Sequence, residues 1–213
     1  MIVLSHRGYW KSAAEKNQPV AFHRSFDLGF GTETDVRDRA GELVISHDMP
    51  DAATMTLADF LDIIGQRPVP LALNIKADGI AENLARSMSD FDRASWFVFD
   101  MSIPDMRMHL RCGNPVYARL SEVESITGWV DDSEGVWLDA FEDDQWYSIG
   151  MIEDLLARGK RVCIVSPELH GRSHRATWAN LQSLRLHQNL MLCTDLPEEA
   201  EAAFGLNRRA DAI

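Results

Sequence analysis

The sequence has few cysteines and little positive charge, and each shortage excludes a class of protein. The three cysteines, Cys112, Cys163 and Cys193, are odd in number and none forms a CxxC pair. This argues against a disulfide framework and against a cysteine-based zinc site. Lys and Arg number 21 against 33 Asp and Glu, which gives a net charge of −12. A nucleic-acid backbone would be repelled, and no polybasic membrane anchor is expected.

Long apolar segments are also missing. No run approaches the roughly 20 residues that a membrane span needs, and the N-terminus lacks the basic and long apolar regions of a signal peptide. We therefore expect a cytoplasmic location. The length of 213 residues suits a single domain over residues 1–213, and a hydrophobic share of 46% is sufficient for a full core.

Short apolar runs recur along the whole chain, and several are continuous Val, Ile and Leu stretches without polar alternation. Such runs are typical of strands covered on both faces of a parallel sheet. The predicted strands are Ile2–Ser5, Thr32–Arg37, Leu43–Ser46, Pro70–Ile75, Trp96–Asp100, Val116–Leu120, Gly135–Asp139, Arg161–Val165 and Leu190–Cys193. Segments with helical spacing lie between them, and the alternation predicts an α/β fold.

Three helical segments have clear signals. Thr56 is a candidate N-cap for the amphipathic stretch that follows it, and Asp59 stands at the capping-box position. Apolar residues at helical spacing also cover Ile152–Leu156, where Gly159 is a stop signal, and Trp178–Leu186.

A glycine-rich phosphate loop is missing after the first predicted strand, where Ser5-His6-Arg7-Gly8-Tyr9-Trp10 stands instead. Such a loop is the usual mark of a doubly wound open sheet. Its absence favours a small (β/α)-barrel, although periodicity alone leaves the open sheet as an alternative.

Two carboxylates, Glu33 and Asp35, are spaced i and i+2 on a predicted strand and should project to the same face. Two buried carboxylates need a cationic partner, and a hard divalent ion such as Mg²⁺ or Ca²⁺ prefers oxygen ligands. The alternative is that both are solvated at the end of the strand.

Two histidines follow predicted strands, His6 with Arg7 and Gly8 directly after it, and His47 before Asp48. In a parallel barrel the carboxyl ends of the strands meet at one rim. Two histidines at that rim could share general acid and base duties, and Arg7 suits phosphate oxygens. Each histidine taken singly could equally be a strand cap.

The order and spacing of three motifs resemble a known family. His6-Arg7-Gly8, then Glu33-Thr34-Asp35-Val36, then the segment from Gly41 to Asp48 are similar to the N-terminal signature of glycerophosphodiester phosphodiesterases. Glu15-Lys16-Asn17 fits a further element of that family more loosely. Leu71–Lys76 resembles its third strand, and the segment Thr194-Asp195-Leu196-Pro197 resembles its closing motif.

The resemblance implies a TIM (β/α)8-type barrel of a small variant. It implies that His6 and His47 are the acid/base pair, that Arg7 and Lys76 bind the phosphate, and that Glu33 and Asp35 bind a metal. The family's third metal ligand is commonly a glutamate, and here Asn74 takes its position. An amide oxygen still coordinates a hard cation but adds no charge, so weaker metal binding is expected.

A second departure follows the seventh barrel strand, where Val165–Arg172 replaces the family's usual Trp-x-Val-Asn. His170 and Arg172 in this loop are candidates for reading a second anionic group of the substrate, because loops at this place in barrels often hold phosphates. A solvated turn is the alternative. Asp100 and Asp139, at two further strand ends, could complete the metal shell in place of Asn74, or could simply cap helices.

The residues together predict a metal-dependent phosphoric diester hydrolase that acts on a glycerophosphodiester or a similar polyol or sugar phosphodiester, with Mg²⁺ or Ca²⁺ as cofactor. The expected partner is a small-molecule phosphodiester, with no nucleic acid and no membrane anchor. Two alternatives remain open at this point. One is a non-catalytic barrel that binds phosphorylated small molecules, and the other is a lyase that uses the same residues to form a cyclic phosphate.

Overall fold

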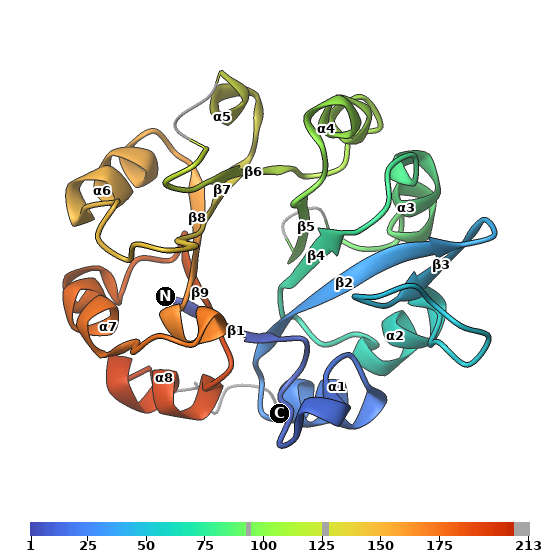
Figure 1. The fold of residues 1–213 in the computed structure, drawn as a ribbon, viewed down its shortest axis with the longest axis horizontal. Helices are drawn as coiled ribbons and strands as arrows, with labels where there is room; N and C mark the ends of the chain where they lie inside the picture. The colour runs from blue at the N-terminus through green and yellow to red at the C-terminus, as the bar shows by residue number, and fades with distance from the viewer. Residues whose placement is uncertain (93–94, 125–127, 207–213) are drawn as a thin grey trace.

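The computed structural model describes residues 1–92, 95–124 and 128–206, and eight parallel strands in it form a ring surrounded by helices (Figure 1). The barrel strands are β1 (Ile2–His6), β2 (Gly31–Arg39), β4 (Leu71–Ile75), β5 (Trp96–Phe99), β6 (Tyr117–Leu120), β7 (Gly135–Leu138), β8 (Arg161–Val165) and β9 (Leu190–Thr194). The α-helices are α1 (Pro19–Asp27), α2 (Leu57–Ile64), α3 (Ala81–Ser87), α4 (Ile103–Arg111), α5 (Trp129–Asp132), α6 (Ile149–Ala157), α7 (Arg175–Leu181) and α8 (Pro197–Phe204).

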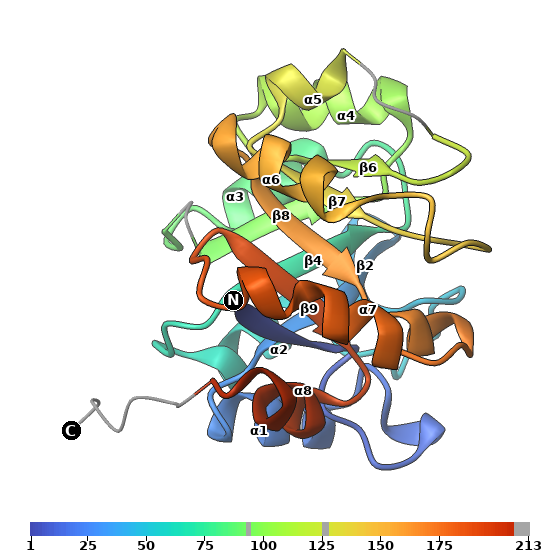
Figure 2. The same cartoon turned by 90° about the vertical axis from the view of Figure 1, so that its left-hand side faces the viewer.

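The strands pair in the order β5-β4-β2-β1-β9-β8-β7-β6, and an isolated parallel bridge between Val98 and Val116 joins the two ends of this order. The sheet is therefore nearly closed, and the predicted TIM-barrel-like α/β fold is confirmed. The strands run toward the side that faces the viewer in Figure 1, as the turned view in Figure 2 shows. Their carboxyl ends thus meet at that face.

Two apolar clusters stabilise the barrel. The inner cluster fills the ring with side chains that include Phe97, Phe99, Tyr117 and Trp137, and the rings of Phe99 and Trp137 stack with their centroids 3.7 Å apart. The outer cluster lies between the strands and the helices. Because alternate residues of each strand enter one cluster or the other, the strands read as continuous apolar runs.

One further strand, β3 (Glu42–Ile45), is antiparallel to β2 and lies outside the order of the barrel. The hairpin turns at Ala40 and Gly41, which both have positive φ angles of 51° and 90°. The chain returns along β2, so that the Ser46 N–H donates to the Asp35 carbonyl at 3.0 Å. His47 therefore reaches the rim through a hairpin that turns back, and not at the carboxyl end of a barrel strand.

All nine predicted strands are present, with bounds that differ by at most two residues. The predicted capping box of α2 is confirmed: the Thr56 hydroxyl accepts from the Asp59 N–H, and the Asp59 carboxylate accepts from the Thr56 N–H. The segment predicted as helical over Trp178–Leu186 is instead the end of α7 followed by a 3₁₀ turn over Gln182–Leu184. None of the helices in the described ranges is long and apolar enough to span a membrane.

Candidate active site

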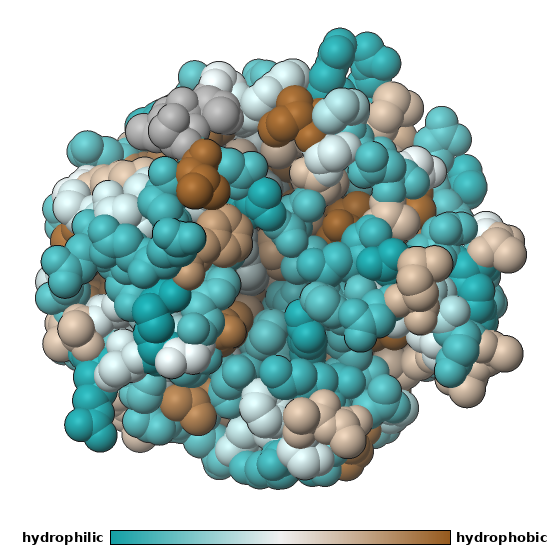
Figure 3. Space-filling view, viewed as in Figure 1, coloured by the Kyte–Doolittle hydropathy of each residue, from teal (hydrophilic) through white to brown (hydrophobic). Residues whose placement is uncertain are grey.

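The carboxyl ends of the barrel strands surround a cavity of about 160 Å³. Its lining comes from six of the eight barrel strands or the loops after them, and consists of His6, Arg7, Glu33, Asn74, Phe99, Asp100, Trp137, Asp139, Val165, Leu169 and His170. Phe99 and Trp137 provide an apolar floor, whereas most of the other side chains are polar. Figure 3 shows this face of the molecule, which is hollowed near its middle and mainly hydrophilic around the hollow.

The loop after β1 is held in a compact, strained conformation. Arg7 has a φ of 57°, which is uncommon for a residue other than glycine. Its N–H donates to the Glu33 carbonyl at 2.9 Å and to the Glu33 carboxylate at 3.2 Å. Gly8 follows with a φ of 80°, and a Cβ atom there would lie 2.8 Å from the Ala21 Cβ. The backbone thus places Arg7 over the barrel mouth only because residue 8 has no side chain.

Asp35 is the electrostatic centre of the site. It is fully buried, and one carboxylate oxygen lies 3.0 Å from Arg7 Nε and accepts a hydrogen bond from the Asn17 amide at 2.8 Å. The other oxygen lies 3.6 Å from Lys76 Nζ. Two cations and an amide therefore compensate the burial of this carboxylate, and in turn Asp35 fixes the positions of both cations.

Glu33 precedes Asp35 by two residues, and the burial of its carboxyl group is compensated much less by nearby positive charge. Its side chain is 2% exposed. Burial, followed by the repulsion of Asp35, raises the pKa of Glu33 from 4.5 to about 7, although His6, Arg7 and Lys76 act in the opposite direction. A buried carboxyl group with a raised pKa in a cavity is a typical mark of a functional site, and a bound cation would restore its ionised form.

His6 is oriented by a carboxylate that sequence reasoning missed. Its Nδ1 lies 2.8 Å from the Asp195 carboxylate at the end of β9. Because an ionised carboxylate only accepts hydrogen bonds, this contact makes Nδ1 the protonated nitrogen. In the neutral ring Nε2 then carries the lone pair, and Nε2 lies 3.9 Å from the Glu33 carboxylate. This arrangement is suited to proton transfer at Nε2.

His47 lies outside this cavity, on the wall of a neighbouring one of about 580 Å³ that also includes Arg7, Asn17 and Asp48. Its side chain is 46% exposed, and its Nδ1 lies 2.9 Å from the Asp48 carboxylate. Arg7 lines both cavities. The structure thus places His6 and His47 in two cavities that share this arginine.

The predicted metal ligands Glu33, Asp35 and Asn74 lie on two adjacent strands, where Asp35 and Asn74 are register partners. Asp35 Oδ1 and Asn74 Oδ1 are both buried oxygens without a hydrogen-bond partner. No three His, Cys, Asp or Glu side chains within the described ranges are grouped so as to hold a metal ion, so a three-ligand shell here depends on the amide of Asn74. Two oxygens without a hydrogen-bond partner, beside a carboxyl group with a raised pKa, fit a hard cation.

Asp100 extends the charged network toward β6. It has a φ of 70°, and its carboxylate lies 3.4 Å from Lys76 Nζ and forms an ion pair with Arg119 on β6. Arg119 in turn forms an ion pair with Glu124. Backbone strain at Arg7 and Asp100 coincides with the cavity, as is common at functional sites.

His170 and Arg172, the two candidates in the loop after β8, have different surroundings. His170 lines the cavity, and its Nε2 lies 2.8 Å from the carboxylate of Asp139, which also lines it. Arg172 is not among the lining residues. Its guanidinium donates to the Asp144 carboxylate and to the carbonyls of Phe141 and Ala140. Arg172 therefore ties the loop after β8 to the loop after β7.

Two residues of the site could not be assigned a role from the sequence. Asn17 donates to Asp35 and accepts from the Thr34 hydroxyl at 2.9 Å, and Asp195 orients His6. Asn17 lies in a loop without periodicity, and its positive φ of 57° is not visible in the sequence. A signal for Asp195 existed, because it follows a predicted strand end in a segment that resembles a family motif. The buried Cys163 and Cys193 have thiol pKa values raised by burial, which disfavours their reactive thiolate forms.

Comparison with solved structures shows the fold. A glycerophosphodiester phosphodiesterase from Parabacteroides distasonis has a TM-score of 0.71 at 16% identity, with 96% of each chain covered. Another from Agrobacterium tumefaciens has 0.71 at 15% identity, covering 96% of this chain and 99% of that one. An Oleispira antarctica phosphodiesterase in complex with its product sn-glycerol-3-phosphate has 0.66 at 15% identity, covering 96% and 97%.

A dihydropteroate synthase from Anaplasma phagocytophilum also matches, with a TM-score of 0.52 at 12% identity and 96% of each chain covered. No protein-family model and no curated protein sequence matches the chain. The chain therefore has the barrel fold of glycerophosphodiester phosphodiesterases. Because one barrel architecture supports different activities, the activity has to be argued from the site.

Proposed function

We propose that the protein is a metal-dependent phosphoric diester hydrolase that acts on a glycerophosphodiester or a similar polyol or sugar phosphodiester. The observation that carries this proposal is the position of His6, which is oriented by Asp195 and shares one cavity with Arg7 and Glu33. The structures with the same fold include phosphodiesterases, one of them in complex with sn-glycerol-3-phosphate, which supports the same class of substrate.

Arg7 and Lys76 would bind the phosphate. Arg7 contacts Asp35 through Nε, and its two terminal nitrogens have no hydrogen-bond partner within the described residues, so they are available to phosphate oxygens. Lys76 lies between Asp35 and Asp100, and adds a second fixed positive charge. A phosphodiester carries a single negative charge, which these two cations can attract in a partly buried site.

Glu33, Asp35 and Asn74 would hold the divalent cation, Mg²⁺ or Ca²⁺. When bound, such an ion supplies positive charge to the phosphoryl oxygens as charge develops on them. The three side chains bring two carboxylates and one neutral amide. We expect the site to bind metal less tightly than one with three carboxylates.

His6 and His47 would share the proton transfers. One histidine removes the proton from the attacking water, and the other gives a proton to the leaving alkoxide. Their positions in two cavities that share Arg7 support this pair.

His170 would contact the part of the substrate beyond the phosphate. With Asp139 at its Nε2, its other ring nitrogen can hydrogen-bond a hydroxyl or an anionic group in the cavity. Arg172 was also expected to bind substrate. Since its guanidinium donates to the protein, we propose that it acts through the position of the loop that carries His170. The cytoplasmic location and the absence of a nucleic-acid partner stay predictions.

The test is turnover of small glycerophosphodiesters by the purified protein, first in excess EDTA and then with Mg²⁺, Ca²⁺ or Mn²⁺. We expect metal-activated release of glycerol phosphate, and a loss of kcat of about 10²–10⁴-fold in His6→Ala. The matched control is His23→Ala, because His23 is exposed on α1 and should leave turnover unchanged. Turnover by none of the metal forms, or equal turnover by His6→Ala, would overturn the proposal. Phosphorus NMR of the product mixture distinguishes hydrolysis from formation of a cyclic phosphate.

A further inference from the structure

The barrel is weakly joined between β5 and β6. Neighbouring strands elsewhere pair over three or more residues, for example β4 with β5 over four. Between β5 and β6 the structure has the isolated bridge of Val98 with Val116, and the Val98 N–H donates to the Pro115 carbonyl at 2.8 Å. Toward their carboxyl ends the two strands separate, and a cavity of about 300 Å³ lies there. We call it the seam cavity.

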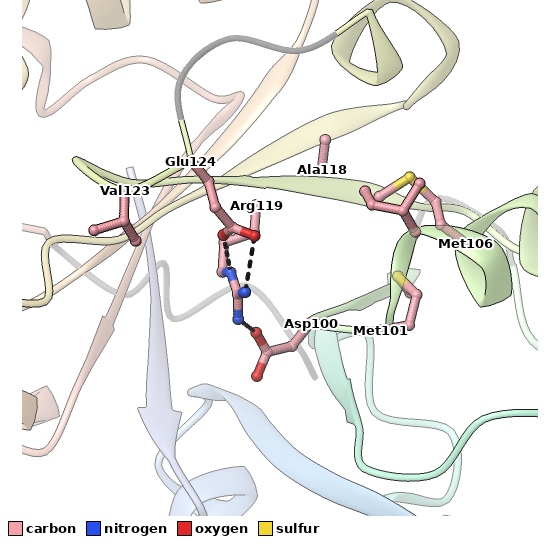
Figure 4. Close-up of a pocket in the computed structure, with 8 residues that line it drawn as sticks. Asp100, Met101, Met106, Ala118, Arg119, Val123 and Glu124 are labelled. Carbon is pink, nitrogen blue, oxygen red and sulfur yellow. Dashed lines mark hydrogen bonds and ion pairs between the residues drawn. The ribbon is translucent and has the colours of Figure 1, made fainter.

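Five of the eight residues that line the seam cavity have apolar side chains (Figure 4). Met101, Met106 and Ala118 are buried and form its inner part between β6 and α4. At its rim lie Ile103, which is 44% exposed, and Val123, which is 71% exposed. Exposed aliphatic side chains next to a buried apolar wall lose unfavourable contact with water when an apolar group covers them.

The polar side chains of the seam cavity are bound to one another. Figure 4 shows Arg119 pointing from β6 toward Asp100, with Glu124 on the other side of its guanidinium. Arg119 donates to Asp100 and to Glu124, and its side chain is 31% exposed. Because these charges pair with each other, they stabilise the seam as an ionic link, and they do not require a charged ligand.

The seam cavity adjoins the candidate active site. Asp100 lines both cavities, and its carboxylate joins Lys76 on the phosphate side to Arg119 on the seam side. A phosphodiester carries two alcohols, and His170 lies away from the seam, in the loop after β8. An alcohol that leaves the phosphate past Asp100 would enter the seam cavity.

We propose that the seam cavity is a subsite for an aliphatic chain on one alcohol of the phosphodiester. This inference rests on the proposed function and narrows its substrate class to phosphodiesters with one alkyl-bearing alcohol. The chain is held by Met101, Met106 and Ala118, and the Asp100–Arg119 pair marks the boundary with the phosphate site. Because the volume is about 300 Å³, a chain of limited length fills it.

The test is a homologous series of glycerol phosphate n-alkyl diesters, from methyl to octyl, with kcat/KM measured below the micelle concentration of each. Burial of a methylene group is worth about 0.8 kcal/mol, so kcat/KM should rise by up to about 4-fold per carbon and reach a plateau when the cavity is full. A flat or falling series would overturn the subsite while leaving the hydrolase intact. Absence of turnover on every ester would instead overturn the proposed function.

Two variants test whether the dependence of kcat/KM on chain length arises in the seam cavity. Ala118→Leu fills the inner wall and should move the plateau to shorter chains. Ile103→Ser removes apolar surface from the rim and should reduce the gain per carbon. Its matched control is Val20→Ser, because Val20 is 47% exposed in the first turn of α1 as Ile103 is 44% exposed in the first turn of α4. If Ala118→Leu does not fold, the pair of exposed variants still decides: equal chain-length profiles for Ile103→Ser and Val20→Ser would contradict the proposal.

Discussion

Replacement of Glu33 by glutamine should stabilise the metal-free protein at alkaline pH and leave its stability unchanged in acid. The pKa of Glu33 is raised from 4.5 to about 7 by burial and by Asp35. The folded protein therefore holds this proton up to about pH 7, whereas the unfolded chain releases it near pH 4.5. Between these values the folded state binds more protons, so its free energy of unfolding falls as the pH rises.

The size of the effect follows from the two pKa values. Their difference of about 2.5, at about 1.4 kcal/mol per pKa unit, corresponds to a loss of about 3 kcal/mol that is complete above pH 7. Glutamine cannot ionise, and its amide oxygen can still accept from the Arg7 N–H, which donates to Glu33 at 3.2 Å. The free energy of unfolding of Glu33→Gln should therefore equal that of the wild type at pH 4 and exceed it by up to about 3 kcal/mol at pH 8.

The assay is urea unfolding in EDTA at pH 4, 6 and 8, with Glu153→Gln as the control because Glu153 is an exposed residue of α6. A second series in excess Mg²⁺ or Ca²⁺ adds the metal. The wild type should then gain stability that Glu33→Gln does not gain, because binding to the folded state alone stabilises it. The reasoning on Glu33 would be refuted if wild type and Glu33→Gln differed in their free energy of unfolding by the same amount at pH 4 and at pH 8.

Three further predictions concern the acid/base pair and the metal. His47→Ala should lower kcat by about 10²–10⁴-fold at an unchanged melting temperature, and near wild-type turnover would remove His47 from the mechanism. Asp195→Asn should lower kcat by less than His6→Ala, because the ring stays in place but loses its ionised partner; steady-state kinetics of both variants check this order. Asn74→Glu should tighten divalent metal binding in a calorimetric titration, because it adds a charged oxygen ligand, and equal or weaker affinity would mean that Asn74 does not contact the metal.

Much of the barrel could be predicted from the sequence because its strands are buried on both faces. β8 and β9, for example, are apolar at nearly every position, and short continuous apolar runs of this kind are typical of buried parallel strands. α2 could be predicted from its capping box, whereas α1 and α8 have no side-chain cap at their N-termini. Helices without such a signal depend on tertiary packing, which a single sequence does not show.

The candidate site could be predicted only in part. His6, Arg7 and Glu33 could be identified from the sequence because they lie at strand ends that the barrel brings together. Asp195 lies 189 residues after His6, and the ion pair of Asp100 with Arg119 depends on the approach of β6. Contacts between distant segments follow from the closure of the ring and not from a local sequence pattern. The sequence therefore indicated which side chains could react, but not which side chains orient them.

The most direct test of the central claim is the product released from a glycerophosphodiester by the wild type and by His6→Ala, each with Mg²⁺ and with EDTA. The account predicts that the wild type with metal releases glycerol phosphate and the free alcohol, that EDTA stops the reaction, and that His6→Ala loses about 10²–10⁴-fold in kcat while it still binds the metal in a calorimetric titration. Full release of both products by His6→Ala, or none by the metal-loaded wild type, would contradict it.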